Sequence, residues 1–285
     1  MANLFSGLES LGFGNLSEMN LFDKDKKDKD EAAKKKVEVK EEDLLFDKTF
    51  ICKACDKEFK AKMVRTGKAK LLSQDSDLRP RYQTVDSLKY DAIVCPYCGF
   101  AALTRFFNYL TDSQAKLIKA NISAKFKGIK EPELILTYDD AILRHKLALI
   151  NAVVKHAKSS EKAYICLKLA WLCRGKSETL PEDTKDLATV RKVLAEQEKE
   201  YITNAYAGFN ESFAKEPFPI CGMDENTLTY LCADIARQIG KYDEALRLVG
   251  RVITAKGAND RIKSKGIEMK ELIKKEKEKL EKANN

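Results

Sequence analysis

The chain has 285 residues, of which 44% are apolar and 34% are charged, and its formal net charge is +8. No run approaches the roughly 20 consecutive apolar residues of a membrane-spanning helix, so we expect no transmembrane segment. The first residues lack the basic region and the continuous apolar region of a secretory signal peptide. We therefore expect a cytoplasmic protein, in which thiols stay reduced and paired cysteines indicate metal binding rather than disulfides.

The chain begins with an apolar segment, and a highly charged stretch follows it. Leucines and phenylalanines dominate residues 1–22, interrupted by three glycines. Residues 23–43 carry 8 basic and 9 acidic side chains, which leaves too little apolar surface to offset the entropy of ordering the chain. We predict an apolar N-terminal segment at 1–22 and a charged, disordered linker at 23–45. The tethered segment is either a docking peptide or a frayed terminus.

Four cysteines in two C-x-x-C motifs give the sharpest signal in the sequence. Cys52 and Cys55 form the first motif, and Cys95 and Cys98 form the second. Because Zn²⁺ favours four thiolate ligands arranged as a tetrahedron, we predict one zinc ion held by these four side chains. With four protein ligands no coordination position stays open for a catalytic water, so the zinc is expected to be structural. Such a site contributes on the order of 10–16 kcal/mol of binding energy to folding.

Two other interpretations of these cysteines stay open, namely a redox pair and buried free thiols. A thioredoxin-like redox pair needs a βαβ setting and one motif only. Thirty-nine residues separate Cys55 from Cys95, more than the roughly 15–20 of a compact four-cysteine finger, so the insert must fold back on itself. Small buried side chains are the expectation for the other four cysteines, which are Cys166, Cys173, Cys221 and Cys232.

Residues 46–100 are predicted to form a zinc-ribbon-like module made of short strands. KEFKAKMVR at 57–65 and TGKAKLLSQ at 66–74 have the composition of strands, with Thr66-Gly67 as a turn between them. YDAIVC at 90–95 is expected to be a third strand that delivers the second cysteine pair.

A polar loop is expected between the second and third of these strands. It contains a dense group of charged and aromatic side chains, namely Asp75, Asp77, Arg79, Arg81 and Tyr82. The loop is either a recognition loop or an ion-paired loop that packs over the ribbon.

Helical periodicity dominates the rest of the chain. The expected helices span 101–127 with a break near Thr111, 138–158, 161–174, 181 to about 214, 225–239, 243 to about 254, and a basic stretch at the C-terminus. We predict a helical domain at 101–260 and a basic C-terminal helix or tail at 261–285. The predicted fold class is therefore α+β and mostly α.

The helix pair around Gly240 carries a second informative pattern. Ala233 lies seven residues before Gly240 and Ala245 lies five residues after it. Small side chains at these positions let two antiparallel helices approach closely, as in a tetratricopeptide repeat (TPR), whose period is about 34 residues. Cys232 stands where the repeat usually has leucine, and no proline ends the repeat. We expect a small, degenerate TPR-like array.

The order of these features carries a resemblance to a known family. The segments are FICKACDKEFKAKMVRTGK, the Asp75-x-Asp77 element, KYDAIVCPYCGFAA, LKLAWLCRGK and YLCADIARQIGKYDEALRLVGRVI. Over roughly residues 45–255 the chain resembles the bacterial family called domain of unknown function 2225. The resemblance implies a zinc-ribbon-like part followed by a TPR-like helical part, with the four cysteines of the two motifs as its metal ligands. The family has no assigned activity, so the resemblance implies no catalytic residue.

The leading functional hypothesis is a non-enzymatic, zinc-containing adaptor whose helical array binds segments of partner proteins. No P-loop, nucleophile elbow or H-E-x-x-H motif occurs in the sequence. Residues 48–100 hold 11 basic and 6 acidic side chains, so one alternative is a nucleic-acid-associated zinc-ribbon protein, with weak binding expected. A second alternative is an enzyme with an unrecognised site in the Asp75–Tyr82 loop.

Deleting residues 1–22 is expected to leave the zinc content and the melting temperature of the protein nearly unchanged. It should change which proteins co-purify with the chain, because the deleted segment is an apolar peptide on a polar tether. Affinity purification from native cytosol with and without the segment is the measurement. An unchanged set of co-purifying proteins would mean that the segment is only a tail.

Overall fold

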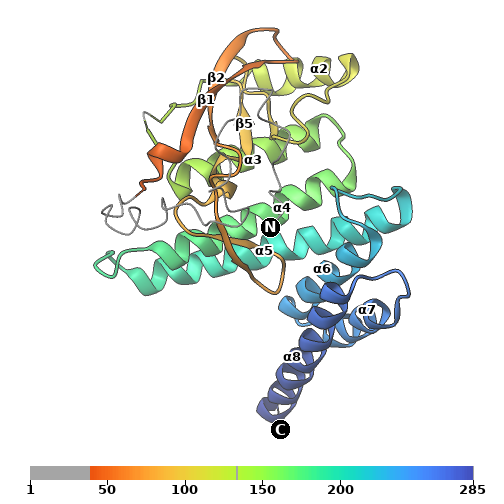
Figure 1. Cartoon of the computed structure of the whole chain (residues 1–285). Coiled ribbons are helices and arrows are strands. Elements are labelled where there is room, and N and C mark those ends of the chain that lie inside the picture. Colours follow the sequence, from red (N-terminus) through yellow and green to blue (C-terminus); the bar gives the residue numbers. More distant parts are fainter. Residues whose placement is uncertain (1–38, 133, 285) are drawn as a thin grey trace, which may run out of the picture. The chain divides into compact units, whose positions relative to one another are not determined.

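The computed structural model describes residues 39–132 and 134–284 (Figure 1). The predicted apolar segment at 1–22 and linker residues 23–38 lie outside the described residues. The end of the predicted disordered linker is ordered instead, because Leu44 and Leu45 are buried in a short 3₁₀ turn and the start of a strand. Within the described part, helices dominate and the strands are short and antiparallel. The predicted fold class, α+β and mostly α, is confirmed.

Among residues 39–132 and 134–284, six strands pair as three separate antiparallel hairpins. The first hairpin joins β1 (Leu45–Ile51) to β2 (Glu58–Val64), the second joins β3 (Leu71–Gln74) to β4 (Pro80–Tyr82), and the third joins β5 (Ala92–Val94) to β6 (Ala101–Leu103). In the first hairpin Phe50 lies opposite Phe59, so the two rings share one face of the pair. All residues of β5 and β6 are buried, so both faces of these strands are apolar and their sequences are short apolar runs without alternation.

The strand predictions are confirmed for 57–65 and 90–95, which contain β2 and β5. The stretch 66–74 is strand only from Leu71, because the residues before it form a turn in which Gly67 has a φ of +74°. The polar stretch expected to be a loop contains the short strand β4. Its three residues are only half-buried, so no alternation of apolar and polar side chains marks it in the sequence.

Seven α-helices are found within the described residues. They are α2 (Asp112–Ile118), α3 (Tyr138–Val154), α4 (Ser159–Thr179), α5 (Leu187–Lys215), α6 (Glu225–Gln238), α7 (Tyr242–Thr254) and α8 (Asp260–Asn284). The break expected near Thr111 is the start of α2, where the Thr111 side chain caps the helix by accepting a hydrogen bond from the Gln114 N–H. None of these helices combines the length and the apolar character that crossing a membrane requires.

Two helix predictions are wrong at their starts. Residues 101–110 are not helical, because Ala101–Leu103 pair with β5 and a turn follows them. The helix expected to begin at Pro181 begins at Leu187, because Thr184 donates hydrogen bonds from both its N–H and its hydroxyl to the Pro181 carbonyl and closes a separate turn.

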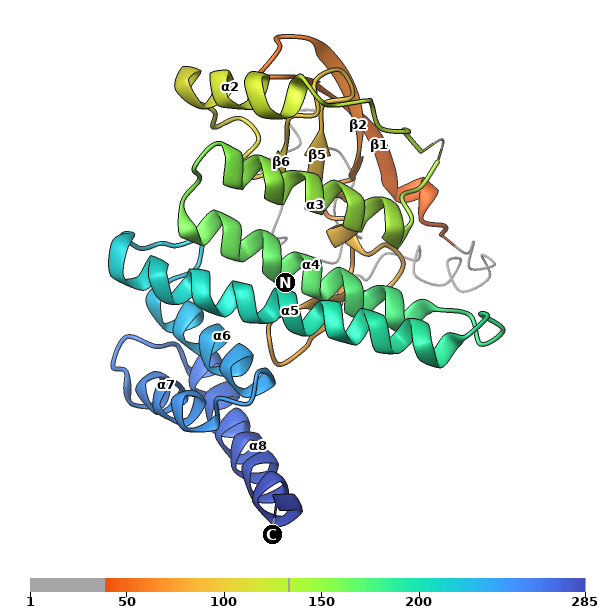
Figure 2. The ribbon, with the colours of Figure 1, turned by 180° about the vertical axis from the view of Figure 1, so that it is seen from behind.

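Helices α3, α4 and α5 lie side by side (Figures 1 and 2), with the β1–β2 and β5–β6 hairpins on the α3 side and α6, α7 and α8 on the α5 side. The residues of α4 from Ile165 to Cys173 are all buried, so this helix is the centre of the main core. Helix α5 packs closely on α4, where a Cβ atom at Gly208 would lie 2.9 Å from the Ala163 Cβ.

Helices α6 and α7 form the hairpin expected around Gly240. Gly240 has a φ of +81°, and its N–H donates to the Arg237 carbonyl, so the residue ends α6 in a left-handed turn. Ala233 and Ala245 are fully buried. The TPR-like character of the helical part and the domain boundaries at 46–100, 101–260 and 261–285 stay predictions.

Candidate metal centre and adjoining pocket

The four cysteines of the two C-x-x-C motifs converge on one point. Their Sγ atoms all lie within 4.8 Å of one another. The Cys52 and Cys98 sulfurs are 3.6 Å apart, and the Cys55 and Cys95 sulfurs are 3.7 Å apart. Three of the side chains are buried and that of Cys55 is half-buried. The sequence pattern alone identified this set.

Each motif sits in the turn of a hairpin, and the two turns have the same hydrogen bonds. The Cys52 N–H donates to the Lys57 carbonyl, and the Asp56 N–H donates to the Cys52 carbonyl. In the second turn Cys95, Gly99 and Phe100 make the equivalent pair of bonds. The residue after the second cysteine has a positive φ in both turns, 60° at Asp56 and 72° at Gly99.

Gly99 has a second reason to be glycine. A Cβ atom at this position would lie 2.6 Å from the ring of Phe126, closer than packed carbon atoms approach. The second turn therefore needs glycine both for its backbone conformation and for its close contact with the ring.

The geometry of the sulfur cluster fits a tetrahedral metal ion. A tetrahedron with metal–sulfur bonds of about 2.3 Å has sulfur–sulfur edges of about 3.8 Å, and the two short separations in the cluster are 3.6 and 3.7 Å. Hydrogen bonds from Cys52 and Cys98 lower the pKa of the Cys95 thiol, and the hydrogen bond to Cys95 raises the pKa of Cys52. The four side chains could hold a metal ion, whose positive charge favours the thiolate form of its cysteine ligands.

Four phenylalanine side chains pack together beside the cysteine cluster. Phe50, Phe59, Phe100 and Phe107 belong to the same apolar cluster as the cysteines. The rings of Phe100 and Phe107 have centroids 5.1 Å apart, and those of Phe50 and Phe107 are 5.5 Å apart and nearly perpendicular. These contacts join the β1–β2 hairpin to the second cysteine turn through one apolar layer.

The remaining cysteines lie outside this cluster. Cys166, Cys173 and Cys232 are buried in helices, in agreement with the prediction of small buried side chains, and Cys221 is half-buried in a loop. Burial raises the pKa of Cys166 and of Cys173 to about 11, so these thiols stay protonated at neutral pH.

The Asp75–Tyr82 stretch forms a buried ionic connection between the β3–β4 hairpin and the helices. The Asp77 carboxylate is fully buried. Its Oδ2 atom accepts from Trp171 Nε1 at 3.0 Å and from Arg174 Nη2 at 2.8 Å, both on α4. Gln238 of α6 donates to the same oxygen at 3.3 Å, and the Arg79 N–H donates to Oδ1 at 3.3 Å.

Further ion pairs extend this connection. Arg79 Nη1 donates to Glu178 Oε2 at 3.0 Å, and Arg81 Nε donates to Asp75 Oδ1 at 2.7 Å. Arg79 is 3% exposed and packs on Gly175, where a Cβ atom would lie 2.8 Å from its Nη2. The alternative of an ion-paired loop that packs over the ribbon is therefore wrong about where the loop packs. The loop is ion-paired, but it packs on α4 and α6, because its partners stand on those helices.

Burial raises the pKa of Asp77, but the charge and the hydrogen bond of Arg174 outweigh burial, so the pKa of the carboxyl is lowered overall. Asp234 of α6 is also fully buried and accepts from Ser76 Oγ at 3.2 Å. Burial raises the pKa of Asp234. The two carboxylates share Gln238 as a donor, which ties the hairpin tip to α6.

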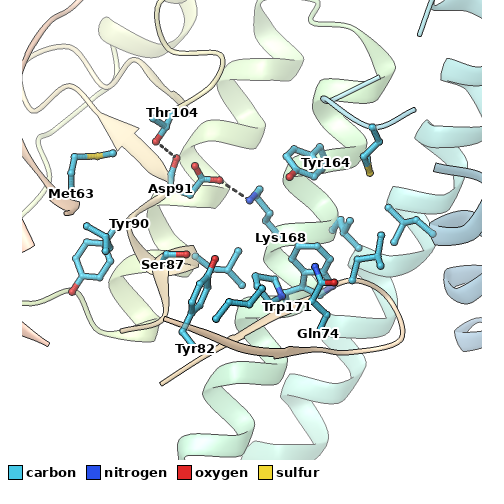
Figure 3. A pocket seen from close by; sticks show the side chains of 18 residues that line it. Met63, Gln74, Tyr82, Ser87, Tyr90, Asp91, Thr104, Tyr164, Lys168 and Trp171 are labelled. Carbon is cyan, nitrogen blue, oxygen red and sulfur yellow. Dashed lines mark hydrogen bonds and ion pairs between the residues drawn. The ribbon is translucent and has the colours of Figure 1, made fainter. Parts of the chain in front are cut away.

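An open pocket of about 560 Å³ lies between the hairpins and α4 (Figure 3). Its walls are mostly apolar or aromatic and include Met63 of β2, Leu71 of β3, Tyr82 of β4 and Trp171 of α4. This size and lining are typical of pockets that bind small molecules or side chains of a partner.

One ion pair stands in the wall of this pocket. Lys168 Nζ lies 2.7 Å from Asp91 Oδ2, and the Lys168 side chain is 9% exposed. The ammonium also lies 4.7 Å from the centroid of the Tyr164 ring. Burial lowers the pKa of Lys168, but Asp91 and Tyr164 outweigh it and raise the pKa, so the ammonium of Lys168 stays charged.

Sequence reasoning missed both this pocket and its ion pair. One signal was available: Lys168 interrupts the apolar run ICLKLAWLC, and a lysine in the middle of a buried helix needs a partner. The partner could not be read from the sequence, because Asp91 lies in a different element, before β5.

A family model described as an uncharacterized protein conserved in bacteria (DUF2225) matches residues 45–279. No curated protein and no solved structure matches the chain. The matched range contains both cysteine motifs, the Asp77 connection and the pocket.

Replacing Asp77 by asparagine is expected to destabilise the fold by about 1–3 kcal/mol, because a buried amide cannot accept all the hydrogen bonds that the carboxylate accepts from Trp171 and Arg174. Arg174 keeps Asp75 and Glu198 as partners, so its own charge stays compensated. Chemical denaturation is the measurement. Asp139→Asn is the matched control, since Asp139 pairs with Lys176 but its side chain is 74% exposed, and its effect should stay below about 1 kcal/mol.

The effect of Asp77→Asn should depend on pH in a defined direction. Because folding lowers the pKa of Asp77, its contribution is complete above the unfolded-state pKa of about 3.9 and disappears as the pH falls through the folded-state pKa. The stability difference between the two proteins should therefore shrink below about pH 4. Equal effects of the Asp77 and Asp139 substitutions at neutral pH would contradict this account.

Proposed function

The chain belongs to the DUF2225 family of uncharacterized proteins conserved in bacteria, and we propose that it is a non-enzymatic, zinc-containing adaptor that binds segments of other proteins in the cytoplasm. One observation carries the proposal: an open pocket of about 560 Å³, with mostly apolar walls, is framed by short hairpins whose outer edges pair with no other strand of the described residues. Apolar walls beside open strand edges suit a protein segment as ligand.

Zinc is the metal that the cysteine cluster suits best. Four cysteine sulfurs at tetrahedral separations are the ligand set of structural zinc sites, and iron–sulfur centres are the other metal sites with this chemistry. The cluster is compact enough for one ion, since all four sulfurs lie within 4.8 Å of one another. Zinc here holds two hairpin turns together and takes no part in a reaction, because four protein ligands leave no open position.

The ionic connection at Asp77 favours a non-enzymatic role for the Asp75–Tyr82 loop. Both oxygens of Asp77 accept hydrogen bonds from the chain's own donors, and the carboxylate is fully buried. A general acid or base must reach a substrate proton, and Asp77 has no exposed atom with which to do so.

A second candidate function, nucleic-acid binding, is favoured by one feature of the cysteine turns. Tyr97 is 55% exposed, and the ammonium of Lys57 lies 5.0 Å from the centroid of its ring. An exposed ring beside a lysine can stack on an unpaired base and contact its phosphate. We rank this function second, because a single tyrosine–lysine pair offers a stacking surface for one base only, whereas single-strand binding uses several.

Purified protein is expected to contain one zinc ion per chain, and Cys52→Ser should lose it. The loss should unfold the β1–β2 hairpin while much of the helical signal remains, because the main core on α4 lies in a separate apolar cluster. Elemental analysis and circular dichroism are the measurements. Cys221→Ser is the matched control and should keep the metal, since Cys221 lies outside the cluster. A metal-free protein purified without chelators would overturn the zinc assignment.

The adaptor proposal predicts a stoichiometric protein partner in the native host. Cross-linking in cells, followed by purification with nuclease treatment, should recover the same partner repeatedly. The purified partner should then bind the recombinant protein directly in calorimetry, and the Cys52→Ser variant should bind it less tightly.

Two outcomes would count against the adaptor. Recovery of nucleic acid in place of protein, with binding that weakens steeply as salt rises, would promote the second candidate. Recovery of the chain alone under all conditions would remove the adaptor function.

A further inference from the structure

The pocket beside Lys168 is bordered by strand edges that no other strand covers. Every sheet in the described part of the chain has two strands, so β2 and β3 each pair along one edge only. Met63 and Val64 at the end of β2 and Leu71 and Gln74 of β3 line the pocket. Open backbone edges beside an apolar pocket are the arrangement in which an extended peptide adds as a further strand.

The turn that connects these two strands is basic. Arg65, Lys68 and Lys70 are exposed, and within residues 39–132 and 134–284 none of the three has an acidic partner in an ion pair. Arg65 directly follows the lining residue Val64, and Lys70 directly precedes the lining residue Leu71. As far as residues 39–132 and 134–284 show, the border of the pocket therefore carries positive charge without an acidic partner, which favours an acidic ligand.

The ion pair in the pocket wall offers a donor and an acceptor side by side. The Asp91 side chain is 25% exposed, and a carboxylate can accept further hydrogen bonds beside the one from Lys168. The ammonium of Lys168 has three N–H donors, of which Asp91 takes one. A peptide backbone presents the complementary groups, an N–H and a C=O, at regular spacing.

We propose that this pocket binds an extended segment of a partner protein that carries apolar side chains flanked by acidic residues. The inference rests on the adaptor function proposed above and names the site and the ligand chemistry. The apolar side chains enter the pocket, the backbone lies along an open strand edge, and the carboxylates lie at the basic turn of Arg65, Lys68 and Lys70.

The chain supplies its own reporter for this binding. It has one tryptophan, and Trp171 lines the pocket (Figure 3). Full-length protein is titrated with a blocked hexapeptide of leucine and valine flanked by glutamates, and tryptophan fluorescence is followed. A saturable change in the Trp171 signal is expected, and the same peptide flanked by lysines should bind about tenfold more weakly, the factor that 1.4 kcal/mol corresponds to.

Two substitutions on one strand separate pocket binding from general surface binding. Leu71 lines the pocket and is 48% exposed, whereas its neighbour Leu72 is 60% exposed and is not part of the lining. Leu72 is the extra residue at an irregularity of the β3–β4 pairing between Leu71 and Ser73, so its side chain is directed differently from that of Leu71. Leu71→Glu should weaken peptide binding at least about tenfold, and Leu72→Glu should leave it within about twofold of the wild type. Both variants should keep their metal and their circular dichroism spectrum, since both positions are exposed.

Backbone recognition is tested with the same hexapeptide carrying N-methyl groups on alternate amides. N-methylation removes the donors that strand pairing needs, so binding should fall by about tenfold or more. Laurate is titrated in parallel as an apolar ligand with one carboxylate and no peptide backbone.

The proposal is overturned if the hexapeptide gives no change in Trp171 fluorescence, if the two leucine substitutions weaken binding equally, or if laurate binds and the peptide does not. If the cross-linked partner from the native host still binds the Leu71→Glu variant with wild-type affinity, the adaptor function stands and the pocket is not its site. If the host yields no partner but the hexapeptide binds as described, the pocket chemistry stands without the adaptor function.

Discussion

The buried carboxylate of Asp77 is the constraint on which the arrangement of hairpin and helices depends. A carboxylate with no exposed surface must have its charge and its lone pairs satisfied by the protein itself. Trp171 and Arg174 on α4 and Gln238 on α6 provide this. These donors are fixed on packed helices, so they determine where the β3–β4 hairpin lies, and the hairpin in turn forms one wall of the pocket.

The cysteine cluster fixes the same part of the chain at its two ends. The 39 residues between Cys55 and Cys95 contain β2, the basic turn, and the β3–β4 hairpin. A metal ion on the four sulfurs would close this insert into a loop, and Asp77 attaches its middle to the helices. Fixing a long loop at its ends and at its middle reduces the number of conformations open to the unfolded chain. This constraint stabilises the two-stranded hairpins of the insert, since an isolated two-stranded hairpin is only marginally stable in water.

Backbone strain at the hairpin tip is consistent with this attachment. Leu78 has a φ of 66°, an uncommon conformation for a bulky side chain that costs on the order of 1–3 kcal/mol. Its side chain packs against the main core and lines the pocket. The buried ionic contacts of Asp77 on one side and this apolar contact on the other hold the turn in its conformation. Tertiary contacts therefore determine the shape of this pocket wall, because a leucine at this position disfavours a positive φ when no such contacts hold it.

The sequence by itself determined the features whose chemistry is local. Two C-x-x-C motifs identified the cysteine cluster, the break near Thr111 marked a helix start, and small residues around Gly240 identified the α6–α7 hairpin, because each motif is itself a short stretch of chain. Helical and strand periodicity was sufficient for the fold class. It failed at β4, whose residues are all half-buried and show no alternation, and at β6, a buried apolar run that periodicity cannot tell from the start of a helix.

Only the tertiary structure decided where the charged side chains find their partners. Asp77 accepts hydrogen bonds from residues 94 and 161 positions away in the sequence, and Lys168 pairs with Asp91 on another element. From the sequence the Asp75–Tyr82 stretch is a polar loop that either recognises a ligand or forms ion pairs over the ribbon. The structure places its ion pairs on α4 and α6 instead, since a charged group is stable in a core once fixed opposite charges surround it, and no local pattern records which helices will supply those charges.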